Sequence, residues 1–143
     1  LLNFTQQLIQ LRRNYPVFCK ANWFKGKAGE DHLEDIAWFY HTGEPVSEKD
    51  WNEAFAKTSA VFLNGKLGCV TSGNGEKIKD NNFYIIFNAY EETREFKLPE
   101  ERYGDRWVKL LDTNEPTTEN KSIHRSGDSL TVPGRSIVLL SCQ

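Results

Sequence analysis

The chain opens with the hydrophobic pattern of one amphipathic helix. Hydrophobic side chains recur at steps of three and four over the first fifteen residues, which is the spacing of one helix face. These positions are Leu1, Phe4, Leu8, Leu11 and Tyr15. Pro16 ends the pattern because proline disfavours helical backbone at the residue before it. No capping residue precedes Leu1, so we expect a helix over residues 1–15 that begins upstream of this chain.

The pattern becomes irregular after the helix and then changes twice more. Residues 17–34 mix aromatic residues, glycines and charges without a period, which predicts a connecting segment. Residues 35–40 read as a short strand that ends in a turn at Thr42-Gly43. Ser47 is followed three residues later by Asp50, which resembles a helix capping box, so we expect a second short helix ending near Lys57.

From Ser59 onward the pattern is typical of strands. The expected strands are 59–63, 83–87, 93–98, 107–111, 129–132 and 136–140. A loop or ragged hairpin is expected up to Asp80, a short turn at 90–92, a long polar surface loop over 112–127, and a closing hairpin around Pro133-Gly134. The sequence therefore predicts a mainly β protein, an antiparallel β-sandwich of about 6–8 strands preceded by an N-terminal amphipathic helix and a short second helix.

Composition narrows the function classes. The 143 residues suffice for one domain, and 18 basic against 20 acidic residues provide no general attraction to nucleic acid or to an anionic membrane surface. No hydrophobic run is long enough to span a bilayer, and no export signal is recognisable. Cys19, Cys69 and Cys142 are widely spaced and odd in number, as in reducing compartments. We expect a cytoplasmic protein with neither nucleic acid nor membrane as partner.

The chain contains no methionine and begins with Leu1-Leu2 in a helical pattern. A natural reading frame begins with methionine, so we interpret the chain as a piece of a longer protein. Catalytic chemistry would then lie outside these residues.

Catalytic motifs are missing from the sequence. There is no nucleophile elbow, phosphate-binding loop, HExxH motif or dinucleotide fingerprint, and Gly73-Asn74-Gly75 has no helix after it. His32, His41 and His124 lack metal-ligand spacing. The acidic residues lie mostly in polar runs, where solvated charge is the ordinary interpretation. We predict no catalytic residue, no metal and no cofactor in this chain.

Aromatic residues remain as binding candidates, because sugar rings stack on indoles. Trp107 alternates like a core residue and Trp51 lies near the start of the second predicted helix, so core packing is favoured for both. Trp23 and Trp38 lie in a loop and at a strand edge, and are the candidates for substrate binding or for contact with another domain.

Several motifs in order resemble a known family. They are Leu11-Arg12-Arg13, Pro16-Val17-Phe18, Asp35-Ile36 with Trp38, Gly43-Glu44, Asp50-Trp51, Val61 to Gly65, Asp80 to Phe83, Phe87-Asn88-Ala89, Leu111-Asp112-Thr113 and Arg135 to Leu140. Over nearly the whole chain this order is similar to the C-terminal end of bacterial glycogen debranching enzymes, in the isoamylase-like branch of the alpha-amylase superfamily. One departure is the segment 19–24, where relatives often carry several arginines before two aromatic residues.

The resemblance implies a glycoside hydrolase that cleaves α-1,6 branch linkages in glycogen or limit dextrins, with its Asp nucleophile and Glu acid/base on an upstream barrel. It implies that residues 1–34 are the last helix of that barrel plus a connector, and that residues 35–143 form the C-terminal β-sandwich domain. The expected partners are then the barrel of the same protein and, for the whole enzyme, glycogen or a branched glucan. None of the family's catalytic carboxylates maps onto this chain.

Two hypotheses from different classes follow, with a third behind them. The chain is either a non-catalytic domain that stabilises or flanks a debranching barrel and is inactive alone, or a carbohydrate-binding module that holds glucan through exposed aromatic residues. A free-standing interaction domain is the third alternative, if the order of the motifs is a coincidence.

Overall fold

The computed structural model describes residues 1–20, 22–29, 31–47, 57–67, 70–116 and 121–143. The N-terminal part is helical, with α1 at Leu2–Asn14 and a short 3-10 helix, η1, at Pro16–Cys19. Tyr15 between them is extended, as expected for a residue that precedes a proline. The predicted amphipathic helix is confirmed.

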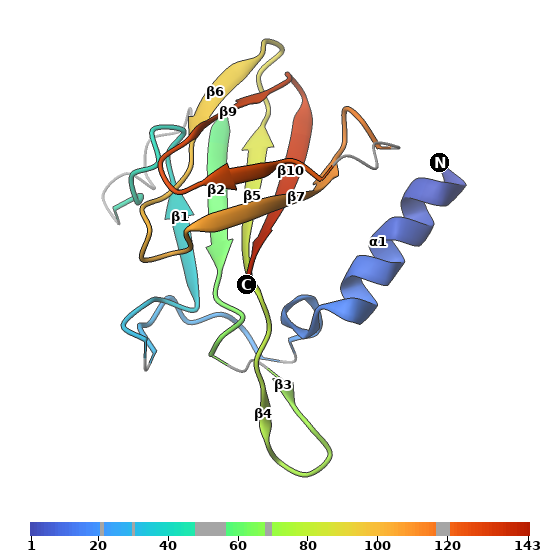
Figure 1. Ribbon diagram of the computed structural model, residues 1–143, viewed down its shortest axis with the longest axis vertical. Coiled ribbons are helices and arrows are strands. Elements are labelled where there is room, and N and C mark those ends of the chain that lie inside the picture. The colour runs from blue at the N-terminus through green and yellow to red at the C-terminus, as the bar shows by residue number, and fades with distance from the viewer. Residues whose placement is uncertain (21, 30, 48–56, 68–69, 117–120) are drawn as a thin grey trace.

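Within the described residues, most of the remaining regular structure is one antiparallel sheet of six strands in the order β1-β2-β5-β10-β7-β8 (Figure 1). Its strands are β1 (Ile36–Phe39), β2 (Thr58–Leu63), β5 (Asn82–Asn88), β7 (Arg106–Asp112), β8 (Ile123–Arg125) and β10 (Ser136–Cys142). Two small antiparallel sheets pair β3 (Val70–Thr71) with β4 (Lys77–Ile78), and β6 (Arg94–Lys97) with β9 (Ser129–Val132).

The main core lies between the six-stranded sheet and the β6–β9 pair. Alternate residues of the large sheet point into it, because successive side chains of a strand face opposite sides. Its largest fully buried side chains are Phe39, Phe62, Tyr84, Phe96, Tyr103 and Trp107. Trp107 is completely buried, as its alternation predicted. The mainly β, two-layered architecture expected from the sequence is therefore confirmed.

The predicted closing hairpin is wrong. β9 pairs with β6 through Phe96 opposite Leu130, whereas β10 pairs with β5 and β7. The chain crosses from the small layer to the large one at Pro133–Arg135, and it crosses in the other direction between β5 and β6. Two strands that are consecutive in sequence therefore lie in different layers, as is common in β-sandwiches.

Asn88 joins these two crossings at the end of β5. It is 2% exposed, and its Nδ2 donates to the carbonyl oxygens of Glu92, Val132 and Pro133, each at 3.0 Å. The backbone N of Arg135 also donates to the carbonyl of Tyr90 at 2.8 Å. One buried amide thus replaces the ladder hydrogen bonds that a hairpin would have formed here.

The prediction of one long loop over 112–127 is wrong in its last part. β8 forms there and extends the edge of the sheet, with His124 opposite Trp107. Three residues of mostly polar composition carry too little hydrophobic pattern to be recognised as a strand, and pairing with β7 supplies the missing stabilisation.

Some predictions fall outside the described residues. The second helix, expected between Ser47 and Lys57, lies almost entirely in 48–56, which includes Trp51, and Cys69 is also outside. Among the residues that the structure describes, no helix is long and hydrophobic enough to cross a membrane.

Candidate functional site

The second face of the six-stranded sheet is hydrophobic as well. Residues of the central strands that point away from the main core form a second cluster, and one row across the sheet runs Trp38, Val61, Ile85, Leu139 and Leu111. We call this surface the outer face and define it by the sheet residues of the second cluster: the buried Val61, Leu63, Phe83 and Leu139, and the partly buried Ile36, Trp38, Ile85, Phe87, Leu110 and Leu111. Leu11, Tyr15, Val17, Phe18 and Phe24 of the same cluster pack on this face.

Only part of the outer face is covered. Tyr15 and Phe18 pack on Phe83, with ring centroids 5.0 Å and 4.7 Å apart, and so fix η1 to the sheet. Val17 is buried, and its backbone N donates to Asp80 Oδ2 at 3.0 Å. Within the described residues, the face is thus covered by η1, the end of α1 and Phe24. The side chains that stay partly exposed are Ile36, Trp38, Ile85, Phe87, Leu110 and Leu111.

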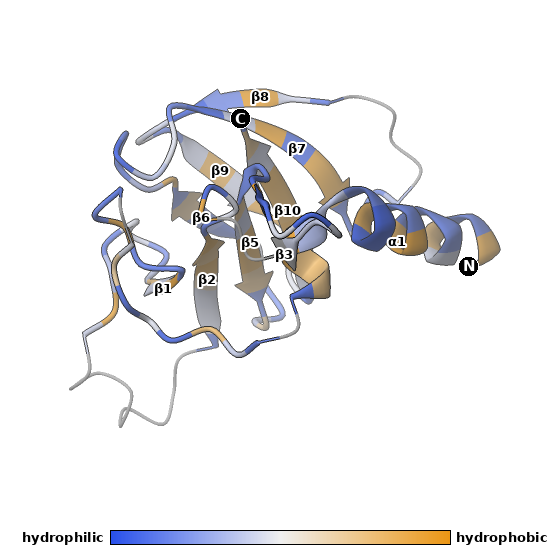
Figure 2. Ribbon diagram, turned by 90° about the horizontal axis from the view of Figure 1, so that it is seen from below, coloured by the Kyte–Doolittle hydropathy of each residue, from blue (hydrophilic) through white to orange (hydrophobic). Residues whose placement is uncertain are grey.

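Most of α1 lies away from the sheet. It has no buried residue, and it extends beside the end of β7 with hydrophobic positions along its length (Figures 1 and 2). Leu2 is 71% exposed and Ile9 is 46% exposed. The helix therefore presents a hydrophobic stripe that the described part of this chain does not bury.

Trp38 and Trp23 occupy different positions. Trp38 lies on the edge strand β1, opposite Val61, and packs half-buried in the outer face. Trp23 lies in the segment between η1 and β1 and is 92% exposed. It borders a hollow of about 470 Å³ whose lining includes Val17 and Phe18 of η1 and Leu63 of the outer face. Trp38 is not among the residues that line this hollow, so the structure does not unite the two candidates in one pocket.

Asp35 fixes the segment that carries Trp23. Its carboxylate is 11% exposed and accepts hydrogen bonds from Lys20 Nζ at 3.1 Å, from the backbone N of Lys25 at 2.9 Å and from that of Gly26 at 2.8 Å. Burial alone would raise the pKa of Asp35, but these hydrogen bonds and the Lys20 charge outweigh it, so the pKa lies below 3.8. Asp35 is therefore an anionic anchor for the loop and is not a proton donor.

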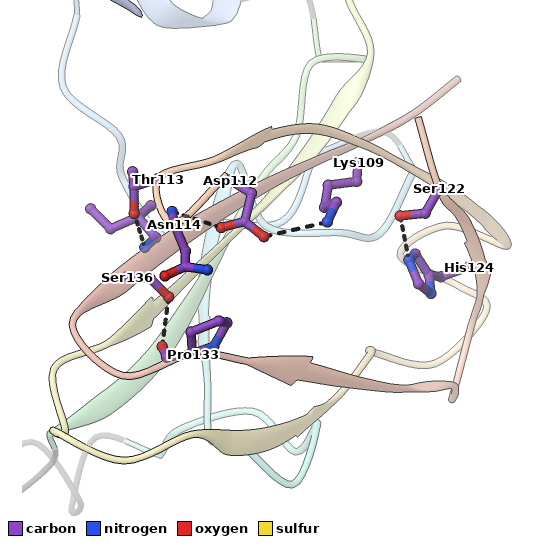
Figure 3. Close-up of polar contacts among 9 residues, drawn as sticks. Lys109, Asp112, Thr113, Asn114, Ser122, His124, Pro133 and Ser136 are labelled. Carbon is purple, nitrogen blue, oxygen red and sulfur yellow. Dashed lines mark hydrogen bonds and ion pairs between the residues drawn. The ribbon is translucent and has the colours of Figure 1, made fainter. Parts of the chain in front are cut away.

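The polar groups at the other edge of the sheet form local pairs (Figure 3). Asp112 accepts from Lys109 Nζ at 3.3 Å and from the backbone N of Asn114 at 2.9 Å. Ser122 Oγ lies 2.9 Å from His124 Nε2. A catalytic triad would need a carboxylate on the other nitrogen of this ring, and no described residue supplies one. These contacts stabilise the ends of β7 and β8.

The described part of the chain shows no metal centre. No group of three His, Cys, Asp or Glu side chains there could hold a metal ion. His32 and His41 lie in a bend and a turn nine residues apart in sequence, and His124 is hydrogen-bonded to Ser122. The candidate binding features of the described residues are therefore the outer face, the hydrophobic stripe of α1 and the exposed Trp23.

Sequence reasoning did not identify the outer face as a candidate site. The signal was present in Phe83 to Phe87, where hydrophobic residues occupy both alternating sets of positions. Such a run predicts a strand buried on both faces, but it does not say what covers the second face. The sheet order places β5 between β2 and β10, so the hydrophobic side chains on the second face of these three strands lie side by side.

Comparisons with known proteins agree with this architecture. Residues 35–141 match the family model described as isoamylase, C-terminal. A protein named glycogen operon protein GlgX homolog from Mycobacterium tuberculosis is 34% identical over 142 residues, which is 98% of this chain and 20% of that protein. Isoamylase from Pseudomonas amyloderamosa is 24% identical over 111 residues, 77% of this chain and 12% of that protein. The chain thus spans about a fifth or less of these relatives.

Solved structures give the same fold at lower identity. Type I pullulanase from Bacillus subtilis, in complex with maltose, superposes with a TM-score of 0.53 at 16% identity, over 97% of this chain and 15% of that one. Pullulanase from Anoxybacillus, in complex with maltotetraose, gives 0.52 at 10% identity, over 96% of this chain and 14% of that one. The resemblance noted in the sequence is confirmed: this chain belongs to the family of isoamylase C-terminal domains.

Proposed function

We propose that this chain is the non-catalytic C-terminal part of a debranching glycoside hydrolase that cleaves α-1,6 branch linkages in glycogen or its limit dextrins. Its family and its relatives named GlgX homolog and isoamylase support this function. We further propose that residues 1–34 are the last helix of the catalytic barrel and a connector, that residues 35–143 are the domain beside it, and that the protein acts in the cytoplasm.

The observation that carries the proposal is the outer face together with α1. A sheet with two hydrophobic faces normally has both faces covered. Burying hydrophobic surface stabilises a folded protein by roughly 25 cal/mol per Å². Within the described residues, η1, the end of α1 and Phe24 cover part of this second side, while Trp38, Ile85 and Phe87 stay partly exposed. We infer that the barrel of the same protein covers the rest and packs against the exposed leucines of α1.

The first test is an activity assay of residues 1–143 on glycogen. We expect no release of linear glucan chains, since none of the family's catalytic carboxylates maps onto this chain. Turnover above a buffer blank would contradict the non-catalytic role.

The second test compares this chain with the longer protein that we propose contains it. The double variant Leu8→Glu/Ile9→Glu places two charges at hydrophobic positions of α1 that are 41% and 46% exposed in the chain alone. We expect its melting temperature to stay unchanged in residues 1–143 and to fall in the longer protein, where two charges would be buried at an interface. Gln6→Glu/Gln10→Glu is the matched control. Equal behaviour of the two variants in the longer protein would contradict the docking role of α1.

One observation favours a second function, which is glucan binding by this domain. Trp23 is 92% exposed, and an indole that is open to solvent beside polar groups suits stacking on a sugar ring. Affinity electrophoresis in glycogen tests this function. Retardation that is lost in Trp23→Ala and kept in Trp38→Ala would support it, whereas an unretarded wild-type chain leaves Trp23 as part of the docking surface.

A further inference from the structure

A hollow with a positively charged lining lies beside the β3–β4 hairpin, which projects from the body opposite the β6–β9 end (Figure 1). Its volume is about 450 Å³. The lining residues are Gly29, Asp31, Lys66, Leu67, Lys77 and Lys79. The described lining residues include three lysines and one aspartate, whose formal charges sum to +2, in a chain whose formal net charge is −2.

A buried residue holds the two walls of this hollow together. Asn64 is fully buried, and its Nδ2 donates to Asp31 Oδ2 at 2.8 Å on one wall. Its Oδ1 accepts from the backbone N of Lys66 at 3.1 Å on the other. Gly29 packs so closely on Leu67 that an added Cβ would lie 2.1 Å from Leu67 Cδ2. The hollow is thus built by fixed contacts between two loops.

The positive charge of the hollow is not neutralised within the described residues. Both carboxylate oxygens of Asp31 already accept hydrogen bonds, Oδ1 from the backbone N of Leu33 at 3.1 Å and Oδ2 from Asn64. None of the three lining lysines forms an ion pair with a described carboxylate. Lys20 and Lys109, by contrast, lie 3.1 Å and 3.3 Å from Asp35 and Asp112.

The lysines come from two elements and line the same hollow. Lys77 lies in β4 and Lys79 two residues later, so the alternation of an extended chain places both on one side. Lys66 approaches from the turn after β2, held by Asn64. Several ammonium groups around one hollow suit an anion with more than one charge, because each can donate a charge-assisted hydrogen bond to it.

We propose that this hollow binds the phosphate group of a small phosphorylated molecule, with Lys66, Lys77 and Lys79 as the ligating residues. The dianionic group would neutralise the lining and accept hydrogen bonds from the three ammonium groups. This site is separate from the outer face, so it does not depend on the proposed docking to a barrel.

Titration of residues 1–143 with inorganic phosphate at constant ionic strength tests this proposal, with backbone amide signals as the readout. We expect saturable shifts that are confined to the amides of Gly29, Lys66, Leu67, Lys77 and Lys79. Lys77→Gln/Lys79→Gln should weaken binding by about tenfold or more, because two charge-assisted contacts are lost. Both side chains are exposed, so the remaining signals should report an unchanged fold.

Controls separate a specific site from general charge effects. Lys57→Gln/Lys97→Gln removes the same charge from exposed positions directly before β2 and in β6, and should bind phosphate as the wild type does. Equal shifts with chloride, no saturation, or unchanged affinity in Lys77→Gln/Lys79→Gln would overturn the proposal. Sedimentation of the chain with phosphatidic acid vesicles, without shifts by soluble phosphate, would also overturn it and would assign the lysines to a lipid surface.

Discussion

At the scale of single residues, some glycines of this chain are required by space alone. Gly65 follows β2, and a Cβ added there would lie 1.9 Å from the carbonyl oxygen of Asn81. That oxygen belongs to backbone next to β5, so it cannot move aside as a flexible side chain could. Gly73, in the turn of the β3–β4 hairpin, has no neighbour within 4 Å of such a Cβ.

We therefore expect Gly65→Ala to lower the free energy of unfolding by roughly 1–3 kcal/mol, the usual cost of forcing an extra carbon into a packed region. Gly73→Ala should leave it within about 0.5 kcal/mol of the wild type. Urea denaturation of both variants measures the difference. A Gly65→Ala variant as stable as Gly73→Ala would mean that the backbone near Asn81 is not fixed as described.

Asp35 gives a residue-scale prediction with a defined pH dependence. Its pKa is lowered on folding, so the ionised form is favoured in the folded state. The stabilisation is complete above the unfolded value of 3.8 and is lost as the pH falls through the lower folded value. Asp35→Asn should cost roughly 1.5–3 kcal/mol at neutral pH, as for hydrogen bonds to charged groups.

The stability difference between wild type and Asp35→Asn should shrink as the pH falls below 3.8. Asp105→Asn is the control, because its partner Arg125 is 74% exposed and exposed ion pairs contribute little. Thermal unfolding followed across the acidic range gives the two curves. A constant difference at every pH would show that Asp35 acts through its shape and not through its charge.

At the scale of elements, the crossings between layers depend on one amide. Asn88 Nδ2 donates to three carbonyl oxygens, which belong to the two crossing segments. In Asn88→Ala these three carbonyl oxygens lose their hydrogen-bond donor. We therefore expect the free energy of unfolding to fall by roughly 1–3 kcal/mol. Asn74→Ala, in the exposed hairpin turn, is the matched control and should be neutral. Chemical denaturation of both variants is the measurement, and a neutral Asn88→Ala would contradict this role.

The sheet elements also show what pattern alone could predict. Strands with strong alternation or two hydrophobic faces, such as β2, β5 and β10, lie within a residue or two of the predicted positions. Their partners did not follow from the pattern, because a turn sequence such as Pro133-Gly134 permits both a hairpin and a crossing to another layer. The choice depends on Asn88 and on the contact of Gly134 with Glu91, where a Cβ would lie 2.1 Å from the carbonyl oxygen.

At the scale of the whole molecule, the helical N-terminus divides into a part that packs on the sheet and a part that does not. Residues 1–9 include no buried side chain, whereas Val17 and Phe18 of η1 lie against the outer face. A chain that begins at Gln10 should therefore keep its free energy of unfolding within about 0.5 kcal/mol.

A chain that begins at Lys20 should lose several kcal/mol, since it uncovers Phe83 and removes a buried Val as well as two aromatic contacts. Denaturation midpoints of the three lengths test this. Equal losses in both truncations would show that the free part of α1 does pack on the sheet in solution.

The sequence by itself determined the N-terminal helix, the β-rich remainder, the core position of Trp107 and the lack of a catalytic motif, because these depend on periodicity and residue type within a few neighbours. The order of its motifs also identified the family. Only the tertiary structure decided the pairing of the strands, the exposure of Trp23, the partly buried outer face and the hollow that Lys66, Lys77 and Lys79 line together. These features join residues that are distant in sequence, and local pattern does not encode which distant strands and loops become neighbours.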